Sequence, residues 1–280
     1  MMHQIVLKSS TPGLSKNLIW LTDLHLDANK SSLLHQFLDL VKNEKAEGVL
    51  IGGDISNGIT SLTHLRYFAK YIDKPIYFVL GNHDYYHSSI ANIRNLAGKL
   101  HLEFPNIHYL TTEGIAQCTQ TIAIIGHDGW ADGRAGNFLT SDIMLHDYLL
   151  IEELTNLTSE ERLKKLNHLG MEAAQYLRER LLEAFKTYEK AILLTHTPPF
   201  RQACLYKGKA CDDNWAPHFV CQTLGEYLIE IAQAHPQKDI LVLSGHSHNS
   251  SDIQILPNLR ILVGHSELGT PSIQGTLHIS

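Results

Sequence analysis

The sequence predicts an α/β fold, in which buried strands alternate with helices. Short apolar runs rich in β-branched residues recur along the chain, and runs of this length suit strands that are buried on both faces. Between several of these runs lie segments whose apolar residues recur at helical spacing. The alternation of the two patterns is typical of α/β proteins, whose central strands are largely parallel.

Seven apolar runs are the candidate strands, taken in the order of the chain. They lie at residues 18–21, 48–51, 76–80, 122–125, 191–194, 240–243 and 259–263. Residues 4–7 and 276–279 predict two further strands, which we expect at the edges of a sheet.

Five segments are the candidate helices. They lie at residues 31–45, 59–71, 88–100, 142–154 and 159–190. The last is the longest, and Thr158 followed three residues later by Glu161 predicts a capping box at its start.

Residues 138–168 predict a helical insert between two of the strands, and we interpret it as a cover over the functional site. The alternative is a plain connection packed on the sheet, which must hold for the last helical turns before Lys190. No internal repeat, low-complexity segment or linker interrupts the chain, so we expect residues 1–280 to form one domain.

Composition and charge exclude several classes of protein. The net charge of −6 argues against a dedicated nucleic-acid binder, because that class usually presents a basic face. No apolar run approaches the roughly 18–20 residues that span a membrane, and no signal peptide is visible, which favours the cytoplasm.

The 4 cysteines are too few and too irregular for a disulfide framework. We expect free thiols, with a zinc site among Cys204, Cys211 and Cys221 as the weaker alternative.

Five short polar clusters each follow one of the apolar runs. They are Asp23-Leu24-His25, Gly52-Gly53-Asp54, Gly81-Asn82-His83-Asp84, His196 and Gly245-His246-Ser247-His248. Ligands gather beyond the carboxyl ends of parallel strands, so these side chains should meet at one edge of the fold. Carboxylates, imidazoles and an amide without thiolate suit divalent ions such as Mn²⁺, Fe²⁺ or Zn²⁺. The clusters therefore predict a binuclear metal site of the kind that hydrolyses phosphoesters.

In this order the clusters resemble the motifs of the calcineurin-like metallophosphoesterases, from Asp23 to His248. The resemblance implies a four-layer α/β/β/α sandwich with a dinuclear centre. It implies a first metal held by Asp23, His25, Asp54 and His248. It implies a second metal held by Asp54, Asn82, His196 and His246, so that Asp54 bridges the two.

Some branches of this superfamily fit the sequence less well than others. Ile55-Ser56-Asn57 stands where the serine/threonine phosphoprotein phosphatases continue with Asp-Arg-Gly, which argues against that substrate class. His83 stands where lipid A pathway hydrolases commonly have Arg. Thr195-His196-Thr197-Pro198-Pro199 is similar to a segment of bacterial cyclic-nucleotide-phosphodiesterase-like members, but the match is too short to identify a substrate.

The predicted reaction is hydrolysis of a small phosphomonoester or phosphodiester by a hydroxide that bridges two divalent metal ions. Mn²⁺ is the expected metal, with Fe, Zn or Mg as alternatives. His83 is the candidate general acid for the departing alkoxide. We expect Asp84 to hold the His83 imidazole and to favour its charged form.

The candidate substrate contacts lie outside the ligand clusters. His127 and Asp128 follow the apolar run 122–125 and should reach the same rim, although a capped turn is the alternative. Arg134 in a glycine-rich stretch can grip a phosphate, unless it is a solvated loop arginine. The long loop at residues 200–218 follows a ligand strand and predicts a binding loop.

Two other classes of function compete with a simple phosphoesterase. One is a nucleotide pyrophosphatase, a cyclic-nucleotide phosphodiesterase or a nuclease, and a nuclease would need a basic groove. The other is a non-catalytic interaction module on the same fold, which should lack some of the ligands. The chain keeps all seven ligand positions, so we expect an enzyme that binds a small phosphorylated substrate.

Overall fold

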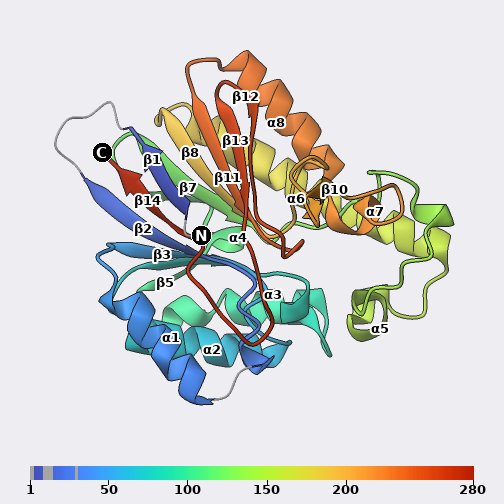
Figure 1. The fold of residues 1–280 in the computed structure, drawn as a ribbon, viewed down its shortest axis with the longest axis horizontal. Coiled ribbons are helices and arrows are strands. Elements are labelled where there is room, and N and C mark those ends of the chain that lie inside the picture. Colours follow the sequence, from blue (N-terminus) through green and yellow to red (C-terminus); the bar gives the residue numbers. More distant parts are fainter. Residues whose placement is uncertain (1–2, 9–14, 29–30) are drawn as a thin grey trace.

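Two sheets of six strands make up the centre of the computed structural model, which describes residues 3–8, 15–28 and 31–280 (Figure 1). The first sheet contains, from edge to edge, β1 (His3–Leu7), β14 (Gly275–Ile279), β2 (Lys16–Leu21), β3 (Gly48–Gly52), β4 (Ile76–Val79) and β5 (Ile107–Tyr109). The second contains β12 (Ser251–Leu256), β13 (Leu259–Val263), β11 (Asp239–Ser244), β8 (Lys190–Thr195), β7 (Ile122–His127) and β6 (Ile115–Gln117). Every predicted apolar run coincides with one of these strands.

The strands that precede the polar clusters are paired in parallel. β2, β3, β4 and β5 are parallel neighbours in the first sheet, and β7, β8, β11 and β13 are parallel neighbours in the second. Antiparallel pairs join β14 to β2, β6 to β7 and β12 to β13. Both sheets are therefore mixed, and within each the central strands end at one edge.

The two sheets pack face to face through alternate residues of their strands. Leu18 and Trp20 of β2 belong to the same buried cluster as Leu194 of β8 and Leu243 of β11. Successive side chains of a strand point to opposite faces, so Ile19, between Leu18 and Trp20, faces away from the second sheet. This alternation explains why the strands are apolar along their whole length.

Helices cover the outer face of each sheet (Figure 1). The first sheet is covered by α1 (Ser31–Asn43), α2 (Ile59–Tyr71) and α3 (Ile90–Ala97). The second is covered by α6 (Ser159–Ala184) and α8 (Gln222–Ala234). The layers are thus α/β/β/α, which confirms the predicted sandwich.

Short elements make up much of the remainder. They are α4 (Leu110–Glu113), α5 (Asp147–Leu150), α7 (Ala216–Phe219), the 3-10 turns η1 (Leu26–Ala28), η2 (His83–Tyr85), η3 (Leu100–Leu102), η4 (Phe138–Thr140) and η5 (Glu152–Leu154), and the hairpin of β9 (Leu205–Tyr206) with β10 (Lys209–Ala210). None of the helices in the described part of the chain combines the length and apolar composition needed to cross a lipid bilayer.

Three sequence-based boundaries are corrected by the structure. The strand expected at an edge near residue 276 is β14, which lies between β1 and β2 because β1 adds to its outer side. The helix expected at residues 142–154 is present only as α5 and η5. The helix begun by Thr158 does form its capping box with Glu161, but it ends at Ala184, since β8 begins at Lys190.

The insert at residues 138–168 extends beyond the sheets, with α5 at the right of Figure 1. It contacts the segment that follows η2, where His87 N–H donates to the Leu150 carbonyl at 2.7 Å. Ser88 and Ile151 form an isolated parallel bridge beside this bond. The later turns of α6 instead pack on β7 and α8, as expected for a connecting helix. The insert is therefore anchored to the chain just beyond the third polar cluster.

Candidate metal centre

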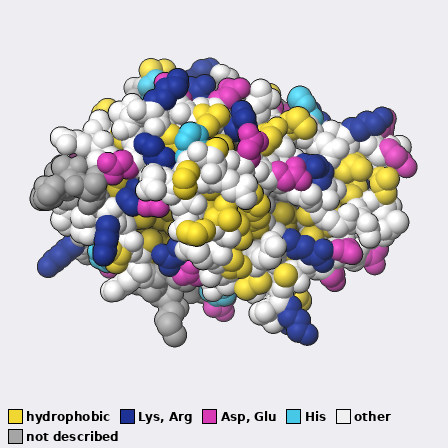
Figure 2. Space-filling model, turned by 90° about the horizontal axis from the view of Figure 1, so that it is seen from above, with side chains coloured by type: hydrophobic (Ala, Val, Ile, Leu, Met, Phe, Trp, Pro, Cys, Tyr) yellow, Lys and Arg dark blue, Asp and Glu magenta, His cyan; other side chains and the backbone are white. Residues whose placement is uncertain are grey.

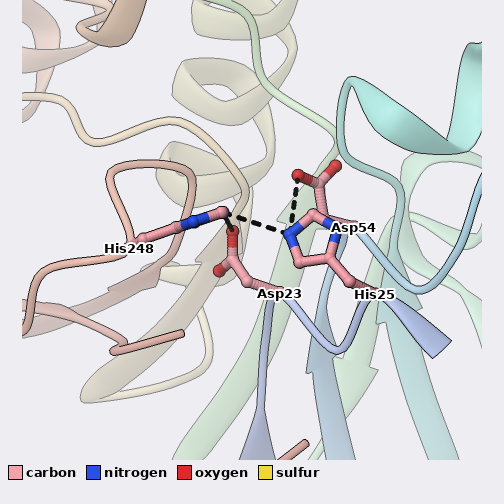
Figure 3. A group of neighbouring side chains, drawn as sticks. All are labelled: Asp23, His25, Asp54 and His248. Carbon is pink, nitrogen blue, oxygen red and sulfur yellow. Dashed lines mark hydrogen bonds and ion pairs between the residues drawn. The ribbon is translucent and has the colours of Figure 1, made fainter. Parts of the chain in front are cut away.

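The five polar clusters meet at the carboxyl ends of five strands, between the two sheets. They follow β2, β3 and β4 of the first sheet and β8 and β11 of the second. Figure 3 shows four of the side chains, Asp23, His25, Asp54 and His248, converging from loops on both sides. The parallel topology therefore brings together residues that lie up to 225 positions apart in the sequence, from Asp23 to His248.

The first group of predicted ligands has one ligand atom from each of four residues within 4.8 Å of the others. The members are Asp23, His25, Asp54 and His248. His25 Nε2 lies 3.1 Å from His248 Nε2, and His248 Nε2 lies 3.4 Å from Asp23 Oδ1. Imidazole and carboxylate donors aimed at one point fit a divalent cation.

The second group shares a carboxylate with the first. Asp54, His196 and His246 also bring one ligand atom each within 4.8 Å. His196 Nε2 lies 3.4 Å from Asp54 Oδ2 and 3.1 Å from Asn82 Oδ1, so the amide oxygen faces the same point. Because Asp54 belongs to both groups, the donor set fits two cations joined by one carboxylate.

The backbone of the centre is in an unusual conformation. Five of the seven predicted ligands have a positive φ, namely Asp23 (51°), His25 (42°), Asp54 (50°), His246 (68°) and His248 (57°). This region is uncommon for residues with a side chain, and such strain concentrates at functional sites. The neighbouring glycines give the ligands room, since a Cβ on Gly245 would lie 1.9 Å from Asp23 Oδ2.

The ionisation of the centre is strongly perturbed. Burial opposes the charge of Asp23, but a hydrogen bond from His248 and the charge of His196 lower the pKa of Asp23 to about 2. Burial likewise opposes the charge of His196, but Asp54 above all raises the pKa of His196 to about 10. Burial, reinforced by the charge of His196, lowers the pKa of His246 to about 3. A metal-bound imidazole must be neutral, so a cation would replace the proton on His196.

Comparison with known proteins identifies the family. Residues 17–250 match the family described as calcineurin-like phosphoesterase. The chain belongs to the calcineurin-like phosphoesterase family. Membership together with the complete Asp/His clusters identifies a hydrolase of ester bonds, and the clusters are consistent with the dinuclear centre of that family.

Solved structures with the same fold include two whose names describe an activity. Phosphopantetheinyl hydrolase from Mycobacterium tuberculosis has a TM-score of 0.64 and 11% identity, with 89% of each chain covered. A dimetal phosphatase from Danio rerio has a TM-score of 0.58 and 15% identity, with 91% of this chain and 89% of that chain covered. At 11% and 15% identity, the similarity to these two structures shows only that the fold is shared. A comparison with proteins of curated function found no match to this sequence.

Asp84 does not hold the imidazole of His83, which corrects the expectation from the sequence. Its Oδ1 accepts from the N–H groups of Ile55 and Ser56 and from the Ser61 hydroxyl, and its Oδ2 accepts from Gly81 N–H. Burial, with the nearby charge of Asp54, raises the pKa of Asp84 to about 7. In this phosphoesterase Asp84 therefore ties together the loops after β3 and β4, because it sits between their backbones.

His83 lies beside the predicted metal ligands and has a different partner from the one expected. Its Nδ1 is 3.3 Å from Asn57 Oδ1, and its Nε2 is 4.0 Å from Asp54 Oδ2. The ring meets that of His25 edge-on at 4.6 Å and lies 4.4 Å from the Tyr86 ring. The side chain is 27% exposed and lines the cleft, so its ring is accessible to a bound molecule.

The three predicted substrate contacts lie elsewhere, which also corrects the expectation. Among the described residues that line the cleft, His127, Asp128 and Arg134 are absent. His127 is buried against Tyr176, and burial lowers its pKa to about 4. Arg134 pairs with Glu226 of α8 at 2.8 Å. β7 lies directly beside the ligand strand β8, but the carboxylate of Asp128 after its end accepts from Leu80 N–H and is buried instead of reaching the cleft.

Asp128 is a buried anchor between the two sheets. Its Oδ1 accepts from Leu80 N–H at 2.8 Å, directly before the cluster that contains Asn82. Its Oδ2 accepts from the hydroxyls of Tyr85 and Tyr109 and from Arg94 Nε at 2.9 Å. These bonds leave the carboxylate without room for a substrate, and they connect the end of β7 to the end of β4.

Asp147 of α5 is a residue of the centre that the sequence pattern missed. It is buried, and its Oδ1 accepts from Asn82 Nδ2 and from the Tyr86 hydroxyl, each at 2.8 Å. Since the amide nitrogen of Asn82 is held by Asp147, the amide oxygen is directed to His196. An aspartate among helix-forming residues carries no local signal of this role. The insert thereby orients a predicted ligand.

The centre opens into a cleft of about 1070 Å³. One wall comes from residues 145–147 of the insert and another from the loop at residues 204–219. The loop therefore occupies the position expected for a binding loop. Its Cys204 and Cys211 are free thiols buried in the structure, as are Cys118 and Cys221.

Replacing Asp128 by alanine should lower the free energy of unfolding by on the order of 3–5 kcal/mol, because the hydroxyls of Tyr85 and Tyr109 lose their buried acceptor and Arg94 keeps only the exposed Glu172 as a partner. Although burial opposes its ionisation, Arg94 and His127 hold the pKa of Asp128 below its ordinary value. The carboxylate therefore stabilises the fold at neutral pH, and this contribution is lost as pH falls through the lowered pKa. Urea unfolding of wild type and Asp128→Ala, from pH 7 down through the ordinary carboxyl pKa of 3.8 to about pH 2, measures both effects.

The control is the exposed arginine–carboxylate pair of Arg66 and Glu103. Glu103→Ala should unfold close to wild type at every pH. Equal unfolding of the two variants would contradict the role of Asp128 as an anchor.

Replacing Asp147 by alanine should weaken the binding of one of two Mn²⁺ ions by roughly 10–100-fold, since the amide of Asn82 loses its orienting partner. Asp147→Asn, which keeps a carbonyl oxygen, should recover most of the affinity. Calorimetric titration of the metal-free protein with Mn²⁺ measures both sites. Leu149→Ala, an exposed position on the same helix, is the matched control. Wild-type affinity at both sites in Asp147→Ala would refute this role.

Proposed function

We propose that this phosphoesterase hydrolyses a phosphate ester of a small molecule, with two divalent cations held by the seven predicted ligands. The observation that carries the proposal is the place of Asp54 in both ligand groups. Its carboxylate is 1% exposed and accepts from His83 N–H at 2.9 Å, so its orientation is set by the backbone. Such a shared carboxylate is what two adjacent cations require.

Asp23, His25, Asp54 and His248 would hold one cation, and Asp54, Asn82, His196 and His246 the other. Cations held there would lower the pKa of a bound water molecule and withdraw charge from the phosphoryl oxygens. Asp147 keeps the Asn82 oxygen turned inward. The net reaction adds water across one P–O bond, so the water oxygen goes to phosphorus and a proton goes to the departing alkoxide.

His83 is the proposed donor of that proton. Its ring lies against His25 and lines the cleft, where a bound ester would meet it. The side-chain oxygen of Asn57 accepts a hydrogen bond from Nδ1 of His83. The other ring nitrogen of His83, Nε2, is the one that faces Asp54. Asn57 thus takes the orienting role that was expected of Asp84.

Surface charge supports a small substrate. On the face shown in Figure 2, lysine and arginine side chains are scattered among acidic and apolar ones, and do not form a stripe. The net charge of −6 points the same way, because a nuclease gains most of its affinity from basic contacts to phosphates. We further propose Mn²⁺ as the working metal, a cytoplasmic location, and a covering role for residues 138–168 within one domain.

Chelation should abolish hydrolysis and lower the melting temperature, and added Mn²⁺ should restore both, since a ligand bound only by the folded state stabilises it. The assay is a panel of p-nitrophenyl phosphate, bis(p-nitrophenyl) phosphate, cyclic nucleotides, nucleoside diphosphate conjugates and a phosphopantetheinyl diester. Asp54→Asn should fold but bind less metal and lose turnover. Absence of both metal binding and turnover in the wild type would reject the proposal.

Replacing His83 by alanine should leave Mn²⁺ binding near wild type and reduce turnover by roughly 10²–10⁴-fold for alkyl leaving groups, which need a proton. Esters of p-nitrophenol should lose much less, because p-nitrophenolate departs unprotonated. The measurement is kcat across leaving groups of rising pKa, with Asp84→Asn as the comparison. A uniform loss across all leaving groups, or a loss of metal, would contradict the role of His83 as the acid.

A further inference from the structure

An aromatic row leads from one end of the metal centre into the cleft. The ring of Phe219 lies 4.6 Å from the ring of His246, and the ring of Trp215 lies 5.8 Å from that of Phe219. All three residues line the cleft. The row therefore continues directly from a predicted metal ligand to the cleft wall.

Trp215 is exposed, whereas the other two tryptophans are buried. Its relative exposure is 44%, against 0% for Trp20 and 5% for Trp130. Tyr206 on the β9–β10 hairpin also lines the cleft and is 63% exposed. Large aromatic side chains beside a reaction centre offer flat apolar surface to a bound molecule.

Hydrogen bonds on both sides hold the loop that carries Trp215. The Asp212 side chain accepts from the N–H groups of Asn214 and Trp215, each at 3.0 Å. Asn214 exchanges two hydrogen bonds with Asp142 of the insert. Arg201 Nε donates to the Cys211 carbonyl at 2.6 Å. The wall is therefore formed before a ligand arrives, which reduces the entropy lost on binding.

The row lies at the opposite end of the centre from the proposed acid. His83 contacts His25, which belongs to the first ligand group, whereas Phe219 contacts His246, which belongs to the second. A phosphorus atom beside Asp54, with its leaving oxygen toward His83, would direct another ester group toward Phe219 and Trp215. Phosphomonoesters have no such second group.

The charges of the cleft also favour a diester. Among the described residues that line it, the lysines are Lys207 and Lys209, both on the β9–β10 hairpin, and none is an arginine. The lining also includes the apolar residues Leu145 of the insert and Leu205 and Ala210 of the hairpin. A dianionic monoester gains most from additional cationic contacts, whereas a monoanionic diester with an organic group suits an apolar wall.

We propose that Phe219, Trp215 and Tyr206 form a subsite for a planar aromatic group of a phosphodiester, on the ester arm that is not cleaved. The inference rests on the proposed function and extends it, because it names the class of substrate. The preferred substrate is an organic phosphodiester with an aromatic ring on the retained arm.

Two diesters with the same leaving group test this directly. Bis(p-nitrophenyl) phosphate and methyl p-nitrophenyl phosphate both release p-nitrophenolate, but only the first retains an aromatic arm. The wild type should prefer the first, and Trp215→Ala should reduce kcat/KM for it by on the order of tenfold while changing the methyl ester little. Trp215→Phe should keep most of the preference. Tyr67→Ala, an exposed tyrosine of α2, is the control and should behave as wild type.

Fluorescence gives a readout that does not depend on turnover. Since Trp215 is the exposed tryptophan, diphenyl phosphate should quench the emission of the Mn²⁺-loaded protein saturably, and dimethyl phosphate should not. Quenching should be lost in Trp215→Phe. Circular dichroism checks that each variant is folded.

The outcomes separate the two hypotheses. Quenching by diphenyl phosphate without turnover of any ester, monoester or diester, would support the subsite and reject the proposed function. Turnover of both diesters with an unchanged preference in Trp215→Ala, or absence of quenching, would overturn the subsite and leave the function standing. Absence of both signals would reject both.

Discussion

The carboxylate of Asp54 is the constraint on which the rest of the centre depends. It is buried at the end of β3, in a left-handed backbone conformation, and it belongs to both ligand groups. Burying a carboxylate is costly unless charge compensates it, and His196 and the surrounding imidazoles hold the pKa of Asp54 well below its ordinary range. The buried carboxylate of Asp54, which follows a strand of the first sheet, therefore needs the imidazole of His196, which follows a strand of the second sheet. This mutual dependence explains why two sheets, rather than one, bound the site.

Other carboxylates serve the centre by holding its backbone. Asp84 joins the loops after β3 and β4 through four hydrogen bonds, and Asp128 joins the ends of β4 and β7. Asp147 orients the amide of Asn82 from the insert. Each is buried, and each faces donors instead of solvent. Strained loops of this kind keep their geometry only when neighbouring groups hold them, which is the task of these three residues.

The predicted metal ligands and the walls of the cleft are built from different parts of the chain. Ligands come from the ends of sheet strands, whose positions are determined by the core between the sheets. The cleft walls come from the insert and from the loop after β8, which contact each other through Asp142 and Asn214. Loops on a rigid scaffold can change without disturbing the core, so one family can act on many substrates.

The sequence by itself determined nine of the twelve strands of the two sheets and the polar clusters, because apolar runs and motif spacing are local signals. The strands β5, β6 and β12 were not predicted, and the four layers followed from the resemblance to the metallophosphoesterases. It also indicated the start of α6 through Thr158 and Glu161. It did not place β14 inside its sheet, since pairing with β1 is a contact across the whole chain. Asp84 and Asp128 were misjudged because their partners are backbone N–H groups and tyrosine hydroxyls from distant segments. Asp147 gave no signal, and Trp215 was indicated only as part of the predicted binding loop at residues 200–218. Only the tertiary structure decides which side a loop presents to the cleft, since that depends on hydrogen bonds between segments that are far apart in sequence.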